Sequence, residues 1–320
     1  MKISVVVPVL NEEQSIRTLL DGLLNQTRPP DEILIVDGGS TDATPRIVEE
    51  YKAQTARVRL IREDNALPGR GRNVGAANAT HEWLAFIDAG VRPHNDWLAG
   101  IVVRAESDTT VDVVYGAWEP VTDSFFKECS AIAYAYVPED GVDEQSRAIL
   151  SSLMKRSVWQ KVGGFSEHLR SAEDLLFMSK IDECGFKTAY APDAVVSWSL
   201  PPSLGRMFSR FFTYSRNNLK AGLGKQWQVS ILLRYLVLLA AAVVLYLVGG
   251  RWPLAIIAML LLMFVARSIA VLWRNRVRFP AGLTRNVARM VTLIPILITL
   301  DAATIAGTIN WLLRDKFRLW

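Results

Sequence analysis

The sequence predicts an α/β fold with a mostly parallel sheet flanked by helices, and three observations support this prediction. Short apolar runs rich in β-branched residues alternate with helical segments through the first 120 residues, a pattern typical of βαβ units. Two of these runs end on an aspartate followed by small residues, at Asp37 and Asp88, as buried parallel strands do at the ligand-binding carboxyl edge of a sheet. A later helical segment carries a third acidic site, Glu173-Asp174.

Each element is predicted from its local pattern. The β-branched run at the N-terminus is the first strand, and Pro29-Pro30 separates the helix after it from the second strand. Pro45 suits the first turn of the second helix. The alternation fades from about residue 122, and Pro201-Pro202 closes the domain. The predicted strands cover 3–9, 33–36, 58–61, 83–88 and 111–118, with later helices at 124–136 and 171–185 and edge strands at 188–190 and 194–198.

The charge of the chain is divided unevenly along its length. Residues 1–200 carry 20 Lys and Arg against 30 Asp and Glu, whereas residues 201–320 carry 16 against 2. The basic excess lies among long apolar runs, where it is typical of membrane-flanking charge, and there is no nucleic-acid-binding motif, so we expect no nucleic-acid partner. Cys129 and Cys184 show no metal-binding spacing, which fits a reducing compartment.

The apolar runs divide the chain into three predicted regions. A soluble domain covers 1–200, an amphipathic interfacial helix region covers 201–228, and a membrane domain covers 229–320. A helix packed on the soluble domain is the alternative reading of the amphipathic segment. The predicted spans are 231–250, 253–273 and 291–313.

The third predicted span is open to another interpretation. It contains Pro295 and Asp301, so a re-entrant or interfacial helix is the alternative to a full crossing. Several arginines follow the second span, whereas the turn between the first two spans carries one charge. By the positive-inside tendency we therefore expect a multi-pass protein of the plasma or bacterial inner membrane whose soluble domain is cytoplasmic.

Six short motifs occur in order along the chain: VVVPVLNE at 5–12, VDGGSTD at 36–42, GRNVG at 71–75, FIDAG at 86–90, VGGF at 162–165 and Glu173-Asp174. In this order they resemble the family 2 glycosyltransferases. The resemblance covers residues 1 to about 200, and its strength lies in the six motifs being in register. It implies a GT-A fold (nucleotide-diphospho-sugar transferase-like), a nucleotide-sugar donor and inversion at the anomeric carbon.

The resemblance assigns the donor-binding residues. Asp37 faces the nucleoside, where a carboxylate accepts hydrogen bonds from uracil N–H or ribose hydroxyls, and Pro8 and Glu12 shape the same pocket. The alternative for Asp37 is an ordinary turn acid. Asp88 corresponds to the first acid of the family's DxD motif, which positions the sugar and a divalent cation, Mg²⁺ or Mn²⁺, that bridges the diphosphate.

The metal site departs from the family pattern at two positions. Gly90 stands where DxD has its second acid, and Trp198 stands where the family often supplies a histidine ligand. Asp88 is therefore the remaining protein ligand, together with the diphosphate and water. Alternatively, cationic side chains replace the metal. The candidates are Arg70, Arg72, Arg92 and Lys155, of which Arg72 is the predicted donor-binding residue.

Glu173-Asp174 resembles the family's acidic pair, whose aspartate is the general base. An acceptor hydroxyl must lose its proton as it attacks the anomeric carbon, and a nearby carboxylate removes it. Ser171 to Asp174 also fits a capping box, and the two roles can coexist.

The acceptor is predicted to be a hydroxyl on a lipid or on a lipid-linked saccharide. Arg206, Arg210 and Arg216 on the amphipathic helix can neutralise the leaving diphosphate on the acceptor side. Two alternatives stay open. A polyprenyl-phosphate sugar synthase has an acceptor that is already anionic and needs no base, and a catalytically silent nucleotide-binding relative would account for Gly90 and Trp198.

Overall fold

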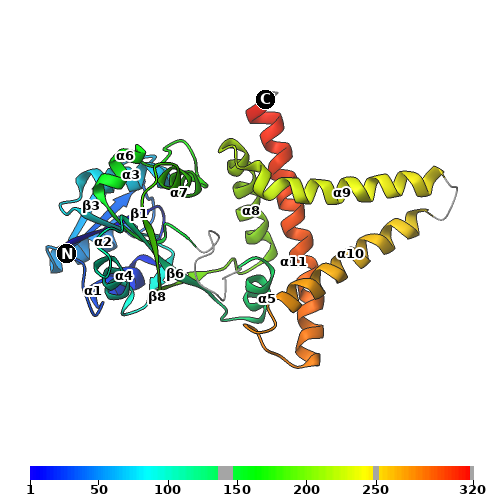
Figure 1. Ribbon diagram of the computed structural model, residues 1–320, viewed down its shortest axis with the longest axis horizontal. Helices are drawn as coiled ribbons and strands as arrows, with labels where there is room; N and C mark the ends of the chain where they lie inside the picture. Colours follow the sequence, from blue (N-terminus) through cyan, green and yellow to red (C-terminus); the bar gives the residue numbers. More distant parts are fainter. Residues whose placement is uncertain (136–146, 248–251, 318–320) are drawn as a thin grey trace. The chain divides into compact units, whose positions relative to one another are not determined.

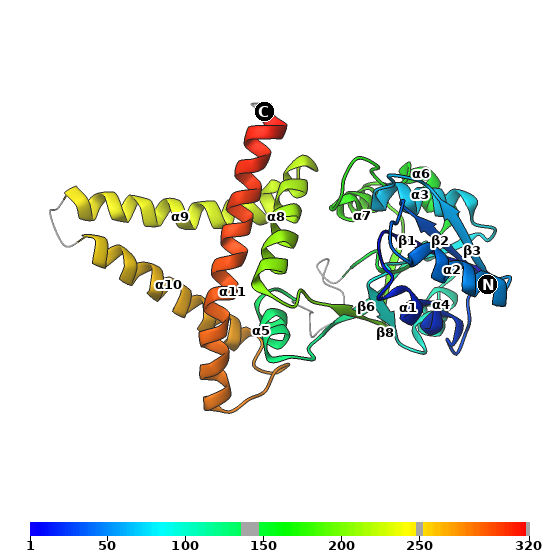
Figure 2. The same ribbon diagram turned by 180° about the vertical axis from the view of Figure 1, so that it is seen from behind.

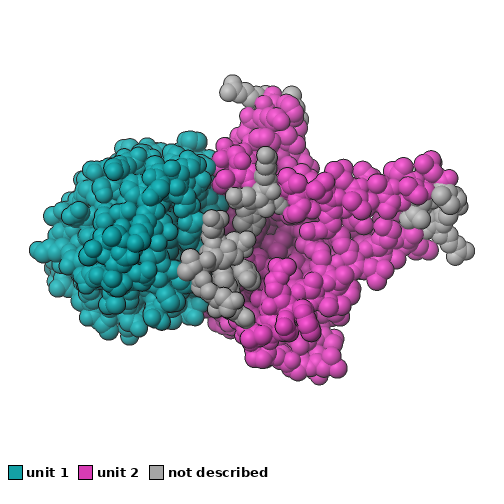
Figure 3. Space-filling view, viewed as in Figure 1, with its two compact units in different colours: residues 1–120, 137–199 teal, residues 121–136, 200–320 magenta. Residues whose placement is uncertain are grey.

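The computed structural model describes residues 1–135, 147–247 and 252–317 (Figure 1). The chain forms two compact units (Figure 3): residues 1–120 with 137–199, and residues 121–136 with 200–320. Residues 121–136 differ from the predicted boundary, which placed them in the first domain. The reason is that α5 (Phe125–Tyr134) shares an apolar cluster with the C-terminal helices, through Cys129 and Ile132.

The first unit is built on a mixed sheet, in which eight strands of the described residues follow the order β3-β2-β1-β4-β7-β6-β8-β5. The neighbours in the half β3-β2-β1-β4 are parallel, whereas β7 is antiparallel to both β4 and β6. The predicted α/β fold is confirmed, and this half holds the parallel pairs β1–β2, β1–β4 and β2–β3. The strands are β1 (Ile3–Val9), β2 (Glu32–Asp37), β3 (Val58–Arg62), β4 (Trp83–Ile87), β5 (Val91–Pro93), β6 (Val113–Val121), β7 (Ser151–Lys155) and β8 (Thr188–Ser199).

Helices cover both faces of this sheet, which explains why its central strands are continuously apolar. Val5 and Val7 belong to one buried cluster and Val6 to the other, as expected when alternate side chains point to opposite faces. The helices are α1 (Ile16–Leu24), α2 (Thr44–Gln54), α3 (Pro68–Asn78), α4 (Trp97–Glu106), α6 (Arg156–Val162) and α7 (Glu173–Glu183).

Small residues let α3 lie directly on β1. A Cβ atom at Gly75 would lie 2.3 Å from Val6 Cγ1, and one at Gly71 would lie 2.9 Å from Pro8 Cβ. Larger side chains at these positions would push the helix away from the strand. The close approach places Arg72 beside the carboxyl end of β1.

The second unit contains α5 and a set of longer helices. The helices α8 and α11 lie side by side, and α9 and α10 form a hairpin that projects away from this pair (Figures 1 and 2). Ser215 on α8 donates a 2.8 Å hydrogen bond to the carbonyl of Thr304 on α11. The bounds are α8 (Leu204–Lys220), α9 (Gly224–Leu247), α10 (Trp252–Arg274), α11 (Leu283–Asn310) and the π-helical η2 (Trp311–Lys316).

Two helices of the described residues are long and apolar enough to cross a membrane, by length and composition. These are Leu254–Arg274 and Leu283–Lys316, which contain the predicted spans 253–273 and 291–313 almost entirely. The predicted span 231–250 runs into residues 248–250, which lie outside the described residues. The apolar helix that is described there, Gln228–Val244, is shorter. The count is therefore two, at the lower end of the predicted two to three.

Candidate functional site

The parallel half of the sheet brings two predicted site residues to one edge. Val9 of β1 pairs with Asp37, the last residue of β2, and Asp88 follows directly after β4. Since β1 and β4 pair in parallel through Val6 and Phe86, Pro8 lies level with Asp88. Asp37 is 1% exposed and its Oδ1 accepts a 3.0 Å hydrogen bond from the Ser40 N–H. This carboxylate therefore also holds the turn that follows it.

The loops after β1 and β2 are tied to each other close to Glu12. The Glu12 N–H donates to Thr44 Oγ1 over 2.8 Å, and its carboxylate accepts from the Ser15 hydroxyl. Asn11 has a left-handed backbone with φ +56°, and its Oδ1 accepts from the Thr41 N–H over 2.9 Å. These bonds fix the shape of the edge beside Asp37.

Arg72 is the centre of the site. Its guanidinium donates from Nη2 to Asp88 Oδ1 and from Nη1 to Glu173 Oε1, each over 2.6 Å. The Arg72 side chain is 5% exposed, and its Cζ lies 5.4 Å from the centroid of the Phe165 ring. Burial alone would lower the pKa of Arg72, but the neighbouring charges of Asp88 and Glu173 offset this and raise it above its usual value. Arg72 is therefore permanently charged and joins a strand end to α7.

The start of α7 differs from the predicted capping box. The helix begins at Glu173, and the residue before it, Ala172, has a left-handed backbone with φ +70° and provides no side-chain cap. Asp174 Oδ1 accepts a 2.8 Å hydrogen bond from the Leu175 N–H instead. The helix therefore begins one residue later than a capping box with Ser171 as its first residue would place it. A positive φ is uncommon for a residue with a Cβ, and here it turns the chain so that Glu173 enters the buried site.

Asp174 is the most perturbed acid of the site. Its burial and the adjacent negative charge of Glu173 raise its pKa to about 6, although Arg72 acts in the opposite direction. A carboxylate with a pKa near 6 is mostly ionised at neutral pH and accepts a proton more readily than an ordinary aspartate. Strongly perturbed acids of this kind are typical of functional sites.

The site carries more negative than positive charge. One guanidinium lies among three carboxylates, those of Asp88, Glu173 and Asp174, and Glu173 Oε2 is buried with no hydrogen-bond partner among the described residues. Buried charge is costly when it is unpaired. The arrangement is therefore suited to a cation or to an added proton.

The described residues offer an incomplete set of metal ligands. No group of three or more His, Cys, Asp or Glu side chains in this part of the chain is placed to hold a metal ion. A Cβ atom at Gly90 would point into open space. Trp198 packs edge-on against Trp118 with ring centroids 5.7 Å apart. Asp88, whose side chain is 39% exposed, can still provide one oxygen, which suffices for Mg²⁺ when phosphates and water supply the rest.

Two of the cations considered as metal substitutes are engaged elsewhere. Arg70 pairs with Glu63 over 2.9 Å and with Glu167 over 3.3 Å. Lys155 pairs with Asp112 over 2.9 Å, and it lies opposite Trp83, at the other end of β4 from Asp88. Both side chains therefore serve local ion pairs in this structure, and their role toward a diphosphate stays a prediction. Arg92 is exposed on β5.

The three arginines predicted on the acceptor side lie on α8 in the second unit. Arg216 pairs with Asp315 of η2 over 2.7 Å. Arg206 is exposed and Arg210 is half-buried. Their role toward a diphosphate stays a prediction.

Two residues in the predicted motifs have contacts that the sequence did not indicate. Phe165 supports the Arg72 guanidinium and stacks on Phe177 with ring centroids 3.9 Å apart. Asn73 accepts from the Phe165 N–H over 2.8 Å and donates to the Phe165 carbonyl over 2.9 Å. Phe165 and Asn73 both belong to motifs identified in the sequence. Their position beside Arg72 was not predicted, because no pattern in the sequence indicates it.

Comparison with known proteins gives matches to one family. Residues 4–161 match the model described as Glycosyl transferase family 2. Over 199 residues the chain is 27% identical to "Glycosyltransferase AglE" of Haloferax volcanii, covering 60% of this chain and 65% of that protein. Over 164 residues it is 43% identical to "Putative glycosyltransferase EpsH" of Bacillus subtilis, covering 50% and 46%. The chain thus spans less than two-thirds of the length of each.

A solved structure shares the fold over nearly the whole chain. It is titled "Mannosyltransferase PcManGT from Pyrobaculum calidifontis in complex with GDP-Man and Mn2+". The match has a TM-score of 0.58 at 21% identity and covers 98% of this chain and 88% of that one.

Proposed function

We propose, from the premise that residues 4–161 are a family 2 glycosyl transferase domain with a GT-A-like fold, that this chain is a membrane-anchored inverting glycosyltransferase. It moves a sugar from a nucleotide-diphosphate donor to a hydroxyl of a lipid or a lipid-linked saccharide. The observation that carries this proposal is the buried cluster in which Arg72 joins Asp88, after β4, to Glu173, at the start of α7.

Asp174 is the general base in this proposal. Its carboxylate takes the proton of the acceptor hydroxyl while the acceptor oxygen bonds to the anomeric carbon. The bond between that carbon and the diphosphate oxygen breaks, and the nucleoside diphosphate leaves with the electron pair. A single displacement of this kind inverts the anomeric configuration. The raised pKa of Asp174 supports this role, because it brings the base closer to neutral pH.

Glu173 and Arg72 position the reacting groups. The Arg72 guanidinium fixes Glu173 on one side and Asp88 on the other, each over 2.6 Å, and charge-assisted hydrogen bonds of this kind limit the motion of both carboxylates. Glu173 in turn keeps its neighbour Asp174 at the site. The arrangement is a preorganised frame for in-line displacement.

The donor is proposed to bind along the edge formed by β1, β2 and β4. Asp37 and Glu12 face the nucleoside end, and Pro8 lies level with Asp88. Asp88 would hold Mg²⁺ or Mn²⁺ there, and such a cation neutralises charge on the leaving diphosphate. PcManGT, which shares the fold, is described with GDP-Man and Mn²⁺. The negative surplus around Arg72 supports the need for a cation.

Membrane anchoring is proposed from the surface of α9 and α10. Large apolar side chains of this hairpin are exposed, for example Leu247 at 75% and Leu262 at 68%, and extended apolar surfaces of this kind mark membrane or protein contacts. Arg274, Arg276 and Arg278 follow at the end of α10. By the positive-inside tendency this end, and the catalytic domain with it, is cytoplasmic.

The test is release of nucleoside diphosphate by the full chain in detergent. UDP-, GDP- and dTDP-sugars are each assayed with Mn²⁺, with Mg²⁺ or with EDTA, in the presence and absence of a membrane lipid extract. We expect one donor to be turned over, with the extract required and the product anomer inverted relative to the donor. Nucleotide binding without turnover in every combination would overturn the proposal in favour of a silent relative.

A further inference from the structure

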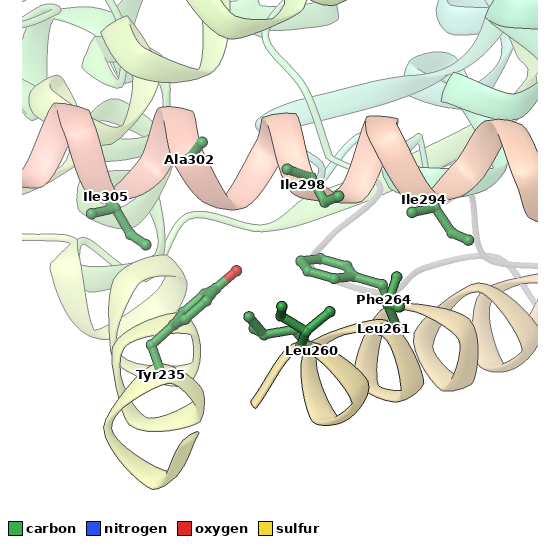
Figure 4. A pocket seen from close by; sticks show the side chains of 9 residues that line it. Tyr235, Leu260, Leu261, Phe264, Ile294, Ile298, Ala302 and Ile305 are labelled. Carbon is green, nitrogen blue, oxygen red and sulfur yellow. The ribbon is translucent and has the colours of Figure 1, made fainter. Parts of the chain in front are cut away.

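An apolar pocket lies between α9, α10 and α11 in the second unit (Figure 4). Its volume is about 410 Å³, within the range of roughly 300–1,000 Å³ that is typical of small-molecule sites. Apart from the Tyr235 hydroxyl, the side chains that line it are apolar. They are Tyr235, Ile257, Leu260, Leu261, Phe264, Ile294, Ile298, Ala302 and Ile305.

A charged cluster adjoins this pocket. Asp301 on α11 is buried and accepts from Arg267 over 2.5 and 3.1 Å, from Arg234 over 3.3 Å and from the Tyr235 hydroxyl over 3.0 Å. Two guanidinium groups thus share one carboxylate. Arg267 satisfies Asp301 with two bonds, whereas Arg234 makes a single, longer bond to it. The cluster therefore has a positive surplus among apolar helices, where unbalanced charge is costly.

The pocket and the cluster are continuous. Tyr235 lines the pocket with its ring and bonds to Asp301 with its hydroxyl. Phe264 also lines the pocket, and its ring lies 5.3 Å from the Cζ of Arg267. Ala302, another lining residue, is next to Asp301 in the chain. The cationic groups therefore border the apolar cavity.

One stripe of α10 connects the two parts. Ile257, Leu260, Phe264 and Arg267 follow each other at intervals of three or four residues, so they lie on one face of the helix. The stripe is about 15 Å long at 1.5 Å per residue. Its charged end lies toward the end of α10, where Arg274 and Arg276 stand, and its apolar end lies toward the start of α10. This is the polarity of a membrane lipid, with a headgroup at one end and a chain at the other.

We propose that this pocket binds one anionic phospholipid of the bilayer. Its phosphate pairs with Arg234 and Arg267, and one acyl chain fills the apolar pocket. Guanidinium groups bind phosphate in a bidentate manner, and an anionic headgroup removes the positive surplus that Asp301 leaves. The inference rests on the membrane anchoring in the proposed function, and it concerns the second unit alone.

The test compares two lipids that differ in headgroup charge. The full chain, purified in detergent and freed of lipid, is titrated with dioleoyl phosphatidylglycerol or dioleoyl phosphatidylcholine, and bound lipids are counted by native mass spectrometry. We expect one tight phosphatidylglycerol adduct, with a preference over phosphatidylcholine of about fivefold or more. Equal binding of the two lipids would overturn the inference.

Arg234→Gln is the informative variant. It removes the surplus charge and leaves Asp301 paired with Arg267, so no buried carboxylate is stranded. We expect the preference for phosphatidylglycerol to disappear, and an unchanged preference would contradict the inference. Arg276→Gln is the matched control, because Arg276 is exposed beyond the end of α10 and lies outside the pocket. This control should keep the wild-type preference.

A second variant tests the pocket itself. Ala302→Phe fills the cavity without changing its charge, and we expect it to lose the tight adduct while its helical circular dichroism stays as in the wild type. A folded Ala302→Phe protein that keeps the adduct would place the lipid elsewhere and overturn the inference. The assay contains no nucleotide sugar. A wild-type chain that turns over donor but shows no lipid preference therefore overturns this inference alone, and a wild-type chain that binds the lipid without turnover overturns only the proposed reaction.

Discussion

The charged clusters of the two units differ in their ratio of carboxylates to basic side chains. In the first unit three carboxylates lie around the single guanidinium of Arg72. In the second unit each of three acids is shared by two bases. These groups are Asp301 with Arg234 and Arg267, Glu128 with Arg285 and Arg289, and Asp315 with Arg216 and Lys220.

The sign of the surplus indicates the kind of partner that each unit accepts. A buried site with net negative charge is stabilised by a bound cation or by a proton. In the proposed reaction the cation accompanies the donor diphosphate, and the proton comes from the acceptor hydroxyl. A positive surplus among apolar helices is relieved by anionic lipid. The individual ion pairs of the two units are similar, but the net charge of the cluster has the opposite sign in each unit. From this sign we infer different partners.

Removing one carboxylate from the first cluster is expected to have the largest effect. Asp174→Asn should lower turnover by about 10²–10⁴-fold, because the acceptor proton loses its base. Burial raises the pKa of Asp174 in the folded state above its value in the unfolded state. The ionised form of Asp174 therefore destabilises the fold, and this cost grows as the pH rises from the unfolded-state pKa to the folded-state pKa. The variant should therefore unfold no more easily than the wild type at pH 7 in chemical denaturation.

Glu183→Gln is the control for this prediction. Glu183 is the exposed last residue of the same helix, far along the chain from the acidic pair. It should keep normal turnover. An Asp174→Asn enzyme with wild-type turnover would show that the surplus carboxylate is structural, as a polyprenyl-phosphate acceptor would allow.

Removing the guanidinium tests the same cluster from the other side. Arg72→Gln strands the buried Glu173, whose side chain is 5% exposed, and should lower the free energy of unfolding by about 3–5 kcal/mol. Denaturant unfolding followed by circular dichroism measures this loss. Arg70→Gln, on the same helix in an exposed ion pair, should cost about 1 kcal/mol or less. Similar losses for both variants would contradict the central role of Arg72.

The pH dependence sharpens the assignment of the base. Because the pKa of Asp174 is raised to about 6, kcat/KM should be steady above that pH and fall by about tenfold per unit below it. The carboxylate is the active form, so activity is lost as it becomes protonated. A pH profile of the wild type and of Glu183→Gln gives the measurement. A profile that stays flat down to pH 5 would remove Asp174 from the proton transfer.

Adding a carboxylate should have the smallest effect. A Cβ atom at Gly90 meets open space, so Gly90→Asp can restore a second acid without strain and should lower the Mn²⁺ concentration for half-maximal activity by about tenfold. Gly90→Ala is the matched control, and it should leave that concentration unchanged. An equal response of both variants to Mn²⁺ would show that residue 90 does not face the cation.

Local patterns were enough to predict much of the fold. Before residue 120, the strands β1, β2, β3, β4 and β6 were found from runs of β-branched residues that end in turns, because both faces of these strands are buried. The short strand β5 (Val91–Pro93) was not predicted. The antiparallel entry of β7 beside β4 was not predicted, since the sequence 151–155 carries no signal for its neighbour or its direction. The start of α7 at Glu173 was not predicted for a related reason: no local pattern indicates the left-handed backbone of Ala172.

The sequence by itself determined which acids end the strands, where the alternation stops and where the basic, apolar half begins. These properties depend on neighbouring residues and on periods of two or about 3.6 along the chain. Only the tertiary structure decided that Arg72 meets Asp88 and Glu173, 16 and 101 residues away, and that Arg234 and Arg267 share Asp301. Such pairs depend on strand register and on how closely helices pack. These are set by contacts between distant parts of the chain, and no local pattern records them.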